Sequence, residues 1–269
     1  MASVPKIRAR EAEKIASFIG EVVERASANG AVVALSGGID SSVVGALCVR
    51  ALGVERVLGL LLPSDHTPEE DTEDARSLAG SWGIKTKTAP ITGIVKSILA
   101  SVGVEGTRVA RGNLEARTRM VISYFYANSM GYLVAGTGDR SELALGYFTK
   151  FGDGGVDLLP IAHLYKTQVR QLGAYLGLPR KLVEKPASPQ LWKGQKATDE
   201  IPAEYDKLDA VLHSILDLGV GAKDAALRGG VPVSVAESAL EMHLRTAHKR
   251  AMAASLLDDG GDRLMAPKD

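Results

Sequence analysis

The residues best suited to chemistry lie in one glycine-rich loop, which reads Ser36-Gly37-Gly38-Ile39-Asp40-Ser41-Ser42. It directly follows a short apolar run and precedes a helical pattern. Glycines let backbone N–H groups converge on a phosphate, serines add hydroxyl donors, and a helix start supplies a positive field. The loop therefore predicts a phosphate-binding site. The simpler alternative is an ordinary glycine turn in which a serine or aspartate caps the helix.

Asp40 is the unusual member of this loop. The loop lacks both the lysine of a Walker loop and the third glycine of a dinucleotide-binding fingerprint. A carboxylate beside bound phosphates repels them unless a cation lies between. Magnesium removes that repulsion because it binds carboxylate and phosphate oxygens together. Asp40 therefore predicts a magnesium nucleotide at the loop.

Strands and helices alternate in the scaffold that must hold this loop. We predict strands at 31–35, 57–62, 84–88 and 132–135, and helices at 11–28, 43–52, 91–101 and 113–128. This alternation favours an α/β fold with a doubly wound parallel sheet, in which ligands sit beyond the carboxyl ends of the strands. The Ser36 loop and Thr137 both fall at such ends.

The remaining segments are expected to complete one domain. From about residue 203 onward, helical patterns at 205–216, 223–228 and 234–249 are joined by glycine and proline turns, which predicts a helical C-terminal part. Ser64 or Thr67 is expected to cap a further helix that is rich in early acids. We expect residues 1–269 to form a single domain with a flexible tail from about 258 to 269.

The overall composition narrows the function classes. Lysine plus arginine equals aspartate plus glutamate, so no basic surplus indicates a nucleic-acid partner. The only cysteine, Cys48, excludes internal disulfides and a cysteine-built zinc site. No segment offers the ~18 uncharged apolar residues that a membrane helix needs. We therefore expect a soluble, cytoplasmic protein that binds neither nucleic acid nor membrane.

Four further segments accompany the loop. They are GNLEARTRM at 112–120, GTGDRSE at 136–142, GYFTKFGDGGVD at 146–157 and TAHKR at 246–250. The loop resembles the S-G-G-x-D-S loop of pyrophosphatase-type ATP enzymes, which cleave ATP between the α and β phosphates. The four segments, in this order, resemble the ammonia-dependent NAD synthetase family in its archaeal-type variant. This resemblance spans most of the chain.

The resemblance implies an activity, substrates and a partner. The expected reaction is the ATP-dependent amidation of deamido-NAD by ammonia, through an acyl-adenylate, to give NAD, AMP and pyrophosphate. The resemblance also implies an adenine-nucleotide alpha-hydrolase-like fold, ATP and Mg²⁺ at the loop, and a homodimer whose interface helps form the deamido-NAD site. Free ammonia is the expected donor, because a glutamine-using form needs an added domain with its own cysteine nucleophile.

The resemblance also implies roles for individual residues. The metal ligands would be Asp40 and Glu142, and the catalytic residues would be Asp40, Glu142, Lys166 and Asp157. Residues at ATP would be Ala34, Leu35, Ser36, Gly37, Gly38, Ile39, Asp40, Ser41, Thr137, Lys166 and Ser188. Residues at deamido-NAD would be Arg117, Lys150, Asp157, His248 and Lys249. Ile39 and Ser188 depart from the family, which often carries glutamine and threonine there.

The residue patterns alone leave several of these roles open. Arg117 shares a predicted helix face with Val121, whereas Arg119 does not, so the expected partner of Arg117 is a ligand phosphate or an acid in a dimer interface. Glu142 fits a ligand site and a helix N-terminal acid equally well. Lys166 begins a helical stretch, where a cation is disfavoured, so it either faces an anion or is solvated.

Other functions and features also remain open on sequence alone. Asp153 or Asp157 is a candidate for deprotonating ammonium, and residues 151–155 form either a mobile lid or a long turn. The rivals within the same fold are a GMP-synthetase-like or tRNA-thiolating enzyme and a nucleotide sensor without turnover. The thiolase predicts paired cysteines and a basic face, which this sequence lacks.

Overall fold

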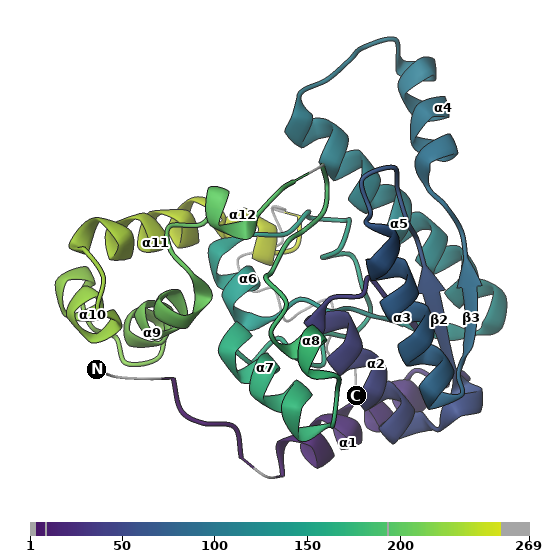
Figure 1. The fold of residues 1–269 in the computed structure, drawn as a ribbon, viewed down its shortest axis with the longest axis horizontal. Helices are drawn as coiled ribbons and strands as arrows, with labels where there is room; N and C mark the ends of the chain where they lie inside the picture. Colours follow the sequence, from purple (N-terminus) through teal and green to yellow (C-terminus); the bar gives the residue numbers. More distant parts are fainter. Residues whose placement is uncertain (1–3, 9, 193, 254–269) are drawn as a thin grey trace, which may run out of the picture.

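A four-stranded parallel sheet forms the centre of the fold (Figure 1). The computed structural model describes residues 4–8, 10–192 and 194–253, so the predicted tail at 258–269 lies outside the described residues. The strands are β1 (Gly30–Ala34), β2 (Val57–Leu61), β3 (Lys85–Thr88) and β4 (Tyr132–Ala135). Their spatial order is β3-β2-β1-β4, so the chain adds strands on one side of β1 and then places β4 on the other.

Helices cover both faces of the sheet, which makes it doubly wound. On one face lie α1 (Glu11–Arg25), α2 (Ile39–Leu52), α3 (Glu69–Trp82) and α7 (Lys166–Tyr175), and on the other lie α4 (Thr92–Val102) and α5 (Arg108–Met130). Ala31 and Val33 of β1 pack with the first group of helices, whereas Val32 packs with the second. A strand covered on both faces needs apolar residues on both, which explains the continuous apolar run that predicted β1.

The remaining helices are mostly gathered beside the sheet (Figure 1). They are α6 (Arg140–Leu145), α8 (Arg180–Val183), α9 (Tyr205–Leu216), α10 (Ala222–Gly229), α11 (Val233–Arg245) and α12 (Ala247–Arg250), with short 3-10 turns at Val54–Arg56 and Ala197–Asp199. A hydrophobic cluster that includes Leu145, Leu208 and Ala236 joins α6 to α9, α10 and α11. The predicted helical C-terminal part is therefore confirmed.

Thr246 interrupts the helix that was predicted over 234–249. Its hydroxyl donates to the backbone oxygen of Met242 at 2.6 Å, and α11 ends before it. The short helix α12 then begins at Ala247. A side-chain hydroxyl that competes for the backbone in this way favours a helix end.

The start of α3 also differs from the prediction. Pro68 precedes the helix, and no side chain caps it. Thr67 instead accepts a hydrogen bond from the backbone N–H of Ser64 at 3.0 Å, within the loop after β2. The predicted cap by Ser64 or Thr67 is therefore wrong, because both residues bond inside the turn.

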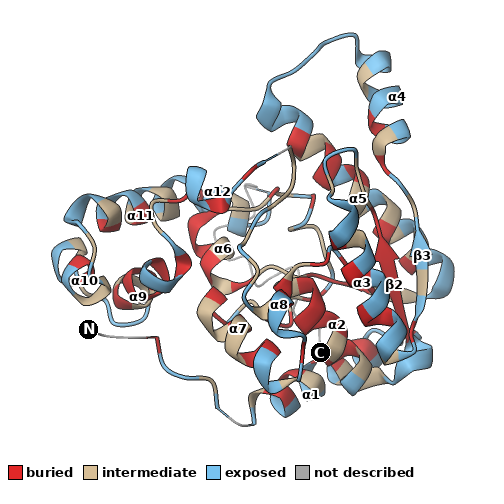
Figure 2. Ribbon diagram, in the orientation of Figure 1, coloured by how far each residue is buried: buried red, intermediate tan, exposed pale blue. Residues whose placement is uncertain are grey.

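Burial is uneven over the molecule (Figure 2). Buried residues lie on the strands and on the helix faces that meet them, whereas α4 and one side of α5 expose apolar side chains. Ile94 is 44% exposed, Val102 55%, Val121 60% and Phe125 69%. These side chains lack a covering layer in the single chain. Within the described ranges, no helix is both long and apolar enough to cross a membrane.

Candidate active site

The glycine-rich loop forms a tight turn between β1 and α2. The backbone N–H of Ser36 donates to the Ser41 hydroxyl at 3.2 Å, and the Ser41 hydroxyl donates to the Gly38 oxygen at 3.1 Å. Gly37 has a positive φ of 74°, and a Cβ there would lie 2.2 Å from the backbone oxygen of Asp71. Only glycine fits this position, which leaves the start of α2 open toward a ligand.

A cavity of about 420 Å³ lies beyond the carboxyl ends of β1 and β4. These strands are neighbours, with Val33 paired to Ala135, and strand addition changes direction between them. Such a switch point is where doubly wound sheets bind ligands. The predicted residues that line the cavity are Ala34, Leu35, Ser36, Gly38, Ile39, Asp40, Thr137, Glu142, Ser188 and Lys249.

Lys166 lies behind this cavity, at the first position of α7, and is fully buried. Its Nζ is 2.8 Å from Asp40 Oδ2, 2.7 Å from Glu142 Oε1 and 3.0 Å from Asp139 Oδ2. Burial opposes its charge, yet Asp139, Asp40 and Glu142 together hold the pKa of Lys166 well above its usual value. Of the two alternatives, a partner anion or solvent, Lys166 therefore has the anion. It does not line the cavity.

Glu142 and Asp139 are fixed by the start of α6. The backbone N–H of Glu142 donates to Asp139 Oδ1 at 2.8 Å, and the backbone N–H of Asp139 donates to Glu142 Oε2 at 3.3 Å. Burial raises the pKa of Glu142 to about 7, the charge of Asp40 acts in the same direction, and Lys166 opposes both. Glu142 therefore belongs to the capping box of α6 and also lines the cavity.

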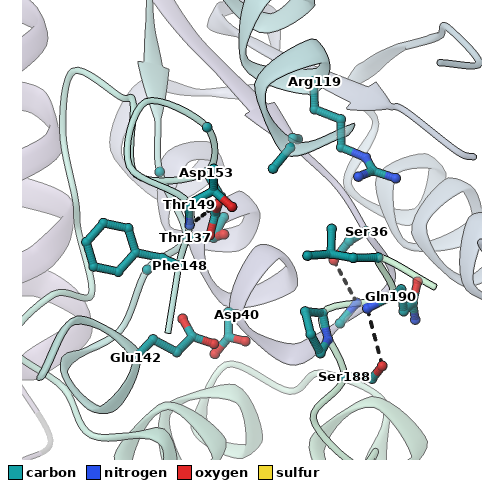
Figure 3. Close-up of a pocket in the computed structure, with 18 of the residues that line it drawn as sticks. Ser36, Asp40, Arg119, Thr137, Glu142, Phe148, Thr149, Asp153, Ser188 and Gln190 are labelled. Carbon is teal, nitrogen blue, oxygen red and sulfur yellow. Dashed lines mark hydrogen bonds between the residues drawn. The ribbon is translucent and has the colours of Figure 1, made fainter. Parts of the chain in front are cut away.

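Asp40 and Glu142 suit a magnesium ion. Their side chains lie close together at one wall of the cavity (Figure 3). Asp40 Oδ1 is buried and has no hydrogen-bond partner among the described residues. Within the same part of the chain, no three His, Cys, Asp or Glu side chains form a ready-made metal site. Magnesium often takes only one or two carboxylates and completes its shell with water and phosphate oxygens, so the pair fits.

Asp209 links the C-terminal helices to this cluster. It is fully buried on α9, and it accepts from the Ser141 hydroxyl at 2.6 Å and from the backbone N–H of Thr167 at 2.8 Å. Ser141 in turn accepts from the backbone N–H of Lys166 at 3.0 Å. Asp209 thus fixes the starts of α6 and α7 relative to each other. The sequence analysis missed this residue because no local motif marks it.

Arg119, and not Arg117, lines the cavity. Arg119 donates from Nε to the Leu62 oxygen at 3.0 Å, and its guanidinium lies 3.6 Å from Glu115. Arg117 is exposed and donates to the Lys150 oxygen at 3.3 Å. Val121 and Phe125 on the Arg117 side of α5 are exposed in the single chain, whereas Leu114 and Tyr124 pack against the core.

Helix α12 and the loop after α6 clamp each other. Lys249 lines the cavity and donates to the backbone oxygens of Gly146 at 2.7 Å and Phe148 at 2.8 Å. Lys150 donates to the backbone oxygens of His248 at 2.6 Å and Ala251 at 2.8 Å. The side chains of Lys150 and His248 do not line the cavity.

The two acids considered for ammonium differ in position. Asp157 accepts from the backbone N–H of Val134 at 2.7 Å and from the Tyr124 hydroxyl at 3.0 Å, and it does not line the cavity. Asp153 lines the cavity and accepts from the backbone N–H of Thr149 at 2.8 Å. Asp153 is therefore the better placed of the two.

Residues 185–190 form the wall opposite Glu142 (Figure 3). The Ser188 hydroxyl donates to the Gln195 oxygen at 2.6 Å. Lys185 donates to the Gly37 oxygen at 3.1 Å and pairs with Asp71. Lys185 therefore places a cation beside the phosphate loop, and the sequence analysis missed it.

The fold and the cavity define an α/β nucleotide-binding protein with a phosphate loop and two metal-suited acids at its switch point. A family model described as NAD synthase matches residues 11–253. The chain therefore belongs to the NAD synthase family.

Individual relatives agree with this assignment. An NH(3)-dependent NAD(+) synthetase from Hyperthermus butylicus is 50% identical over 90% of this chain and 88% of its own length. Among solved structures, an NMN synthetase from Francisella tularensis matches with a TM-score of 0.82 and 35% identity, over 91% of this chain and 97% of that one. An NH3-dependent NAD synthetase from Campylobacter jejuni matches with a TM-score of 0.78 and 32% identity, over 92% and 97%.

Proposed function

We propose that this chain is a ligase that amidates the nicotinate carboxylate of deamido-NAD with ammonia and ATP, giving NAD, AMP and pyrophosphate. The observation that carries the proposal is the cavity at the switch point, where the phosphate loop meets Asp40 and Glu142. A resonance-stabilised carboxylate does not react with ammonia until it gains a leaving group. Attack of the carboxylate on the α-phosphorus of ATP, with loss of pyrophosphate, supplies one as an acyl-adenylate, and ammonia then displaces AMP.

The chain contributes positioning and charge in this reaction. The loop N–H groups, Thr137, Ser188 and Lys185 would bind ATP, and Asp40 and Glu142 would hold Mg²⁺. When bound, the ion neutralises charge on the departing pyrophosphate. Lys166 keeps the two acids at the cavity wall.

The deamido-NAD site is proposed to form across a homodimer. Arg117 lies on the same exposed side of α5 as Val121 and Phe125. Exposed apolar surface of this kind marks association sites. A second copy packed there brings Arg117 toward the dinucleotide, together with Lys150, Asp157, His248 and Lys249. We propose that each protomer is a single domain and that the protein works in the cytoplasm, where ATP is supplied. Light scattering tests the assembly, and a molar mass of two chains is expected.

A second candidate substrate is the acid that corresponds to NMN. The similarity to the Francisella tularensis NMN synthetase favours it, because NMN carries the same nicotinamide ring as NAD. The mononucleotide lacks the AMP half of deamido-NAD, so it occupies less of the same site.

One assay separates these functions. Purified protein is incubated with ATP, Mg²⁺ and ammonium, and with deamido-NAD, nicotinic acid mononucleotide, XMP or tRNA. Pyrophosphate release and the amide product are both measured. We expect NAD from deamido-NAD, with a kcat/KM at least about tenfold above that for the mononucleotide. A preference for the mononucleotide supports NMN synthesis instead, and no pyrophosphate from either nucleotide contradicts both.

A further inference from the structure

The buried carboxylate of Asp209, on α9, reaches the starts of two other helices. Its Oδ1 accepts from the Ser141 hydroxyl of α6, and its Oδ2 accepts from the backbone N–H of Thr167 of α7. The same Ser141 hydroxyl oxygen accepts from the backbone N–H of Lys166. An anion is favoured beside helix starts, because their free N–H groups carry partial positive charge. One carboxylate therefore ties α6 to α7.

These two helix starts carry residues of the candidate metal site. Glu142 directly follows Ser141 on α6, and Lys166 directly precedes Thr167 on α7. The Lys166 ammonium lies 2.7 Å from Glu142 Oε1 and 2.8 Å from Asp40 Oδ2. A shift of α6 moves the Glu142 carboxylate relative to Asp40 on α2, and a shift of α7 moves the ammonium between them. The link between the helix starts therefore determines the spacing of the two acids.

Helix α9 is a firm support for Asp209. The neighbouring Leu208 is fully buried and belongs to the same hydrophobic cluster as Leu145 of α6. Tyr205 precedes Asp209 by four residues, so the two side chains share a helix face. The Tyr205 ring lies 5.3 Å from the Lys166 ammonium. Helix α9 therefore meets Lys166 both at its backbone, through Asp209 and a bridging hydroxyl, and at its charged end.

We propose that Asp209 is a positioning residue that sets the affinity of the site for the magnesium nucleotide. The inference rests on the proposed function, in which Asp40 and Glu142 hold the metal. Groups that orient the ligands of a metal matter nearly as much as the ligands, and losing one typically weakens binding or activity about 10- to 100-fold. Asp209 stands in this relation to Glu142, through Ser141, and does not line the cavity. It acts on the metal ligand and touches no substrate.

The test is nucleotide binding to Asp209→Asn, with and without metal. The variant keeps the size of the side chain, but its NH2 group cannot accept a hydrogen bond. Titration calorimetry measures the Kd of the manganese complex of an ATP analogue with a methylene bridge between the α and β phosphorus atoms. We expect this Kd to rise about tenfold. The Kd of the metal-free analogue, measured with a chelator, and the KM for deamido-NAD are expected to stay within about twofold of the parent.

A second variant tests the same link more gently. Ser141→Ala removes only the bridging hydroxyl and is expected to raise the Kd of the manganese complex about threefold. The double variant is expected to match Asp209→Asn within about twofold, because both changes break one path. A residue that only stabilises the fold lowers the free energy of unfolding and leaves the metal dependence of binding unchanged.

Asp206→Asn is the matched control on the same helix. The Asp206 side chain is 75% exposed and pairs with Arg170, so both Kd values are expected to match the parent. An unchanged Kd for the manganese complex in Asp209→Asn or Ser141→Ala, or an equal rise with the metal-free analogue, overturns the proposal. Parent protein that binds the manganese complex but forms no NAD contradicts the amidation and not the role of Asp209.

Discussion

The lysines on two sides of the cavity differ in their partners: one pairs with carboxylates, and the others donate to backbone oxygens. Lys166, behind the phosphate loop, is buried against three carboxylates. Lys249 and Lys150, at the α12 side, bond only to backbone oxygens, and among the described residues no carboxylate lies within 4.0 Å of either ammonium. The first cation is neutralised by the protein itself, whereas the other two keep their charge available.

This difference assigns the two sides different tasks. The acids around the Lys166 ammonium supply carboxylate oxygens at the cavity, which suit a divalent cation and its triphosphate. Cations that bond only to neutral oxygens leave a positive site, which suits the phosphates of a dinucleotide. Burial lowers the pKa of Lys249, and the nearby Asp153 opposes that effect. An anionic ligand beside Lys249 would stabilise the charged ammonium against the effect of burial. The charge pattern therefore separates the ATP side of the cavity from the dinucleotide side.

The largest expected effect is the loss of Lys166. Lys166→Met leaves the buried Asp139 and the partly buried Asp40 and Glu142 without their counter-ion. Removing one partner of a buried ion pair is expected to cost about 3–5 kcal/mol in the free energy of unfolding. Urea denaturation in the presence of a chelator measures it. Adding Asp139→Asn is expected to restore part of the loss. A cost no greater than that of the matched variant Lys249→Met would remove the contrast between the two sides.

The next largest effect concerns catalysis. Asp40→Asn keeps the shape of the side chain but removes a charge from the metal site, so kcat is expected to fall about 100- to 1,000-fold with little change in fold. Steady-state amidation across a magnesium titration measures the change. The exposed acid in Asp224→Asn serves as the control and is expected to behave like the parent. Normal magnesium-dependent turnover in Asp40→Asn would refute the metal assignment.

A smaller effect follows from the pKa of Glu142. Burial raises that pKa from 4.5 to about 7. Between these values the unfolded chain has lost the proton and the folded chain keeps it, so the metal-free protein loses stability as the pH rises. Glu142→Gln removes this loss. Its free energy of unfolding relative to the parent is expected to rise by on the order of 2 kcal/mol from pH 4.5 to pH 7. If urea denaturation gave the same pH dependence of the free energy of unfolding for Glu142→Gln and the parent, the raised pKa of Glu142 would be contradicted.

The smallest effect is expected at the α12 side. Lys249→Met removes a cation that forms no ion pair within 4.0 Å with a described carboxylate, so stability is expected to change by less than about 1 kcal/mol. The KM for deamido-NAD is expected to rise about tenfold while the KM for ATP stays the same. Initial-rate kinetics with each substrate varied in turn measure both values. A rise in the KM for ATP alone would contradict the placement of Lys249 on the dinucleotide side of the cavity.

The sheet and the phosphate loop were predictable because their signals are local. All four predicted strands lie within one residue of their expected ends, since apolar runs and turn residues determine them directly. The Ser36 loop was found in the same way, from the segment that follows β1, whereas the ligand role of Glu142 was implied by the family resemblance. Their convergence required only the rule that parallel strands end at one edge.

Other site residues were not predictable because tertiary packing brings them in. Asp209, Lys185 and Tyr205 come from segments without a motif. Only the folded chain places Lys185 and Tyr205 at the cavity and Asp209 behind it, against Ser141. Arg117 and Arg119 show a second limit of prediction from sequence. An apolar helix face identifies a surface to be covered, but it does not say whether the core or a second copy covers it.

The most direct measurement uses deamido-NAD labelled with ¹⁸O in its nicotinate carboxylate. If the cavity activates that carboxylate by attack on the α-phosphorus of ATP, one labelled oxygen remains with the leaving group when ammonia displaces it. Mass spectrometry of the products is therefore expected to find ¹⁸O in AMP and none in pyrophosphate. Label in pyrophosphate or in inorganic phosphate, with unlabelled AMP, would contradict the account.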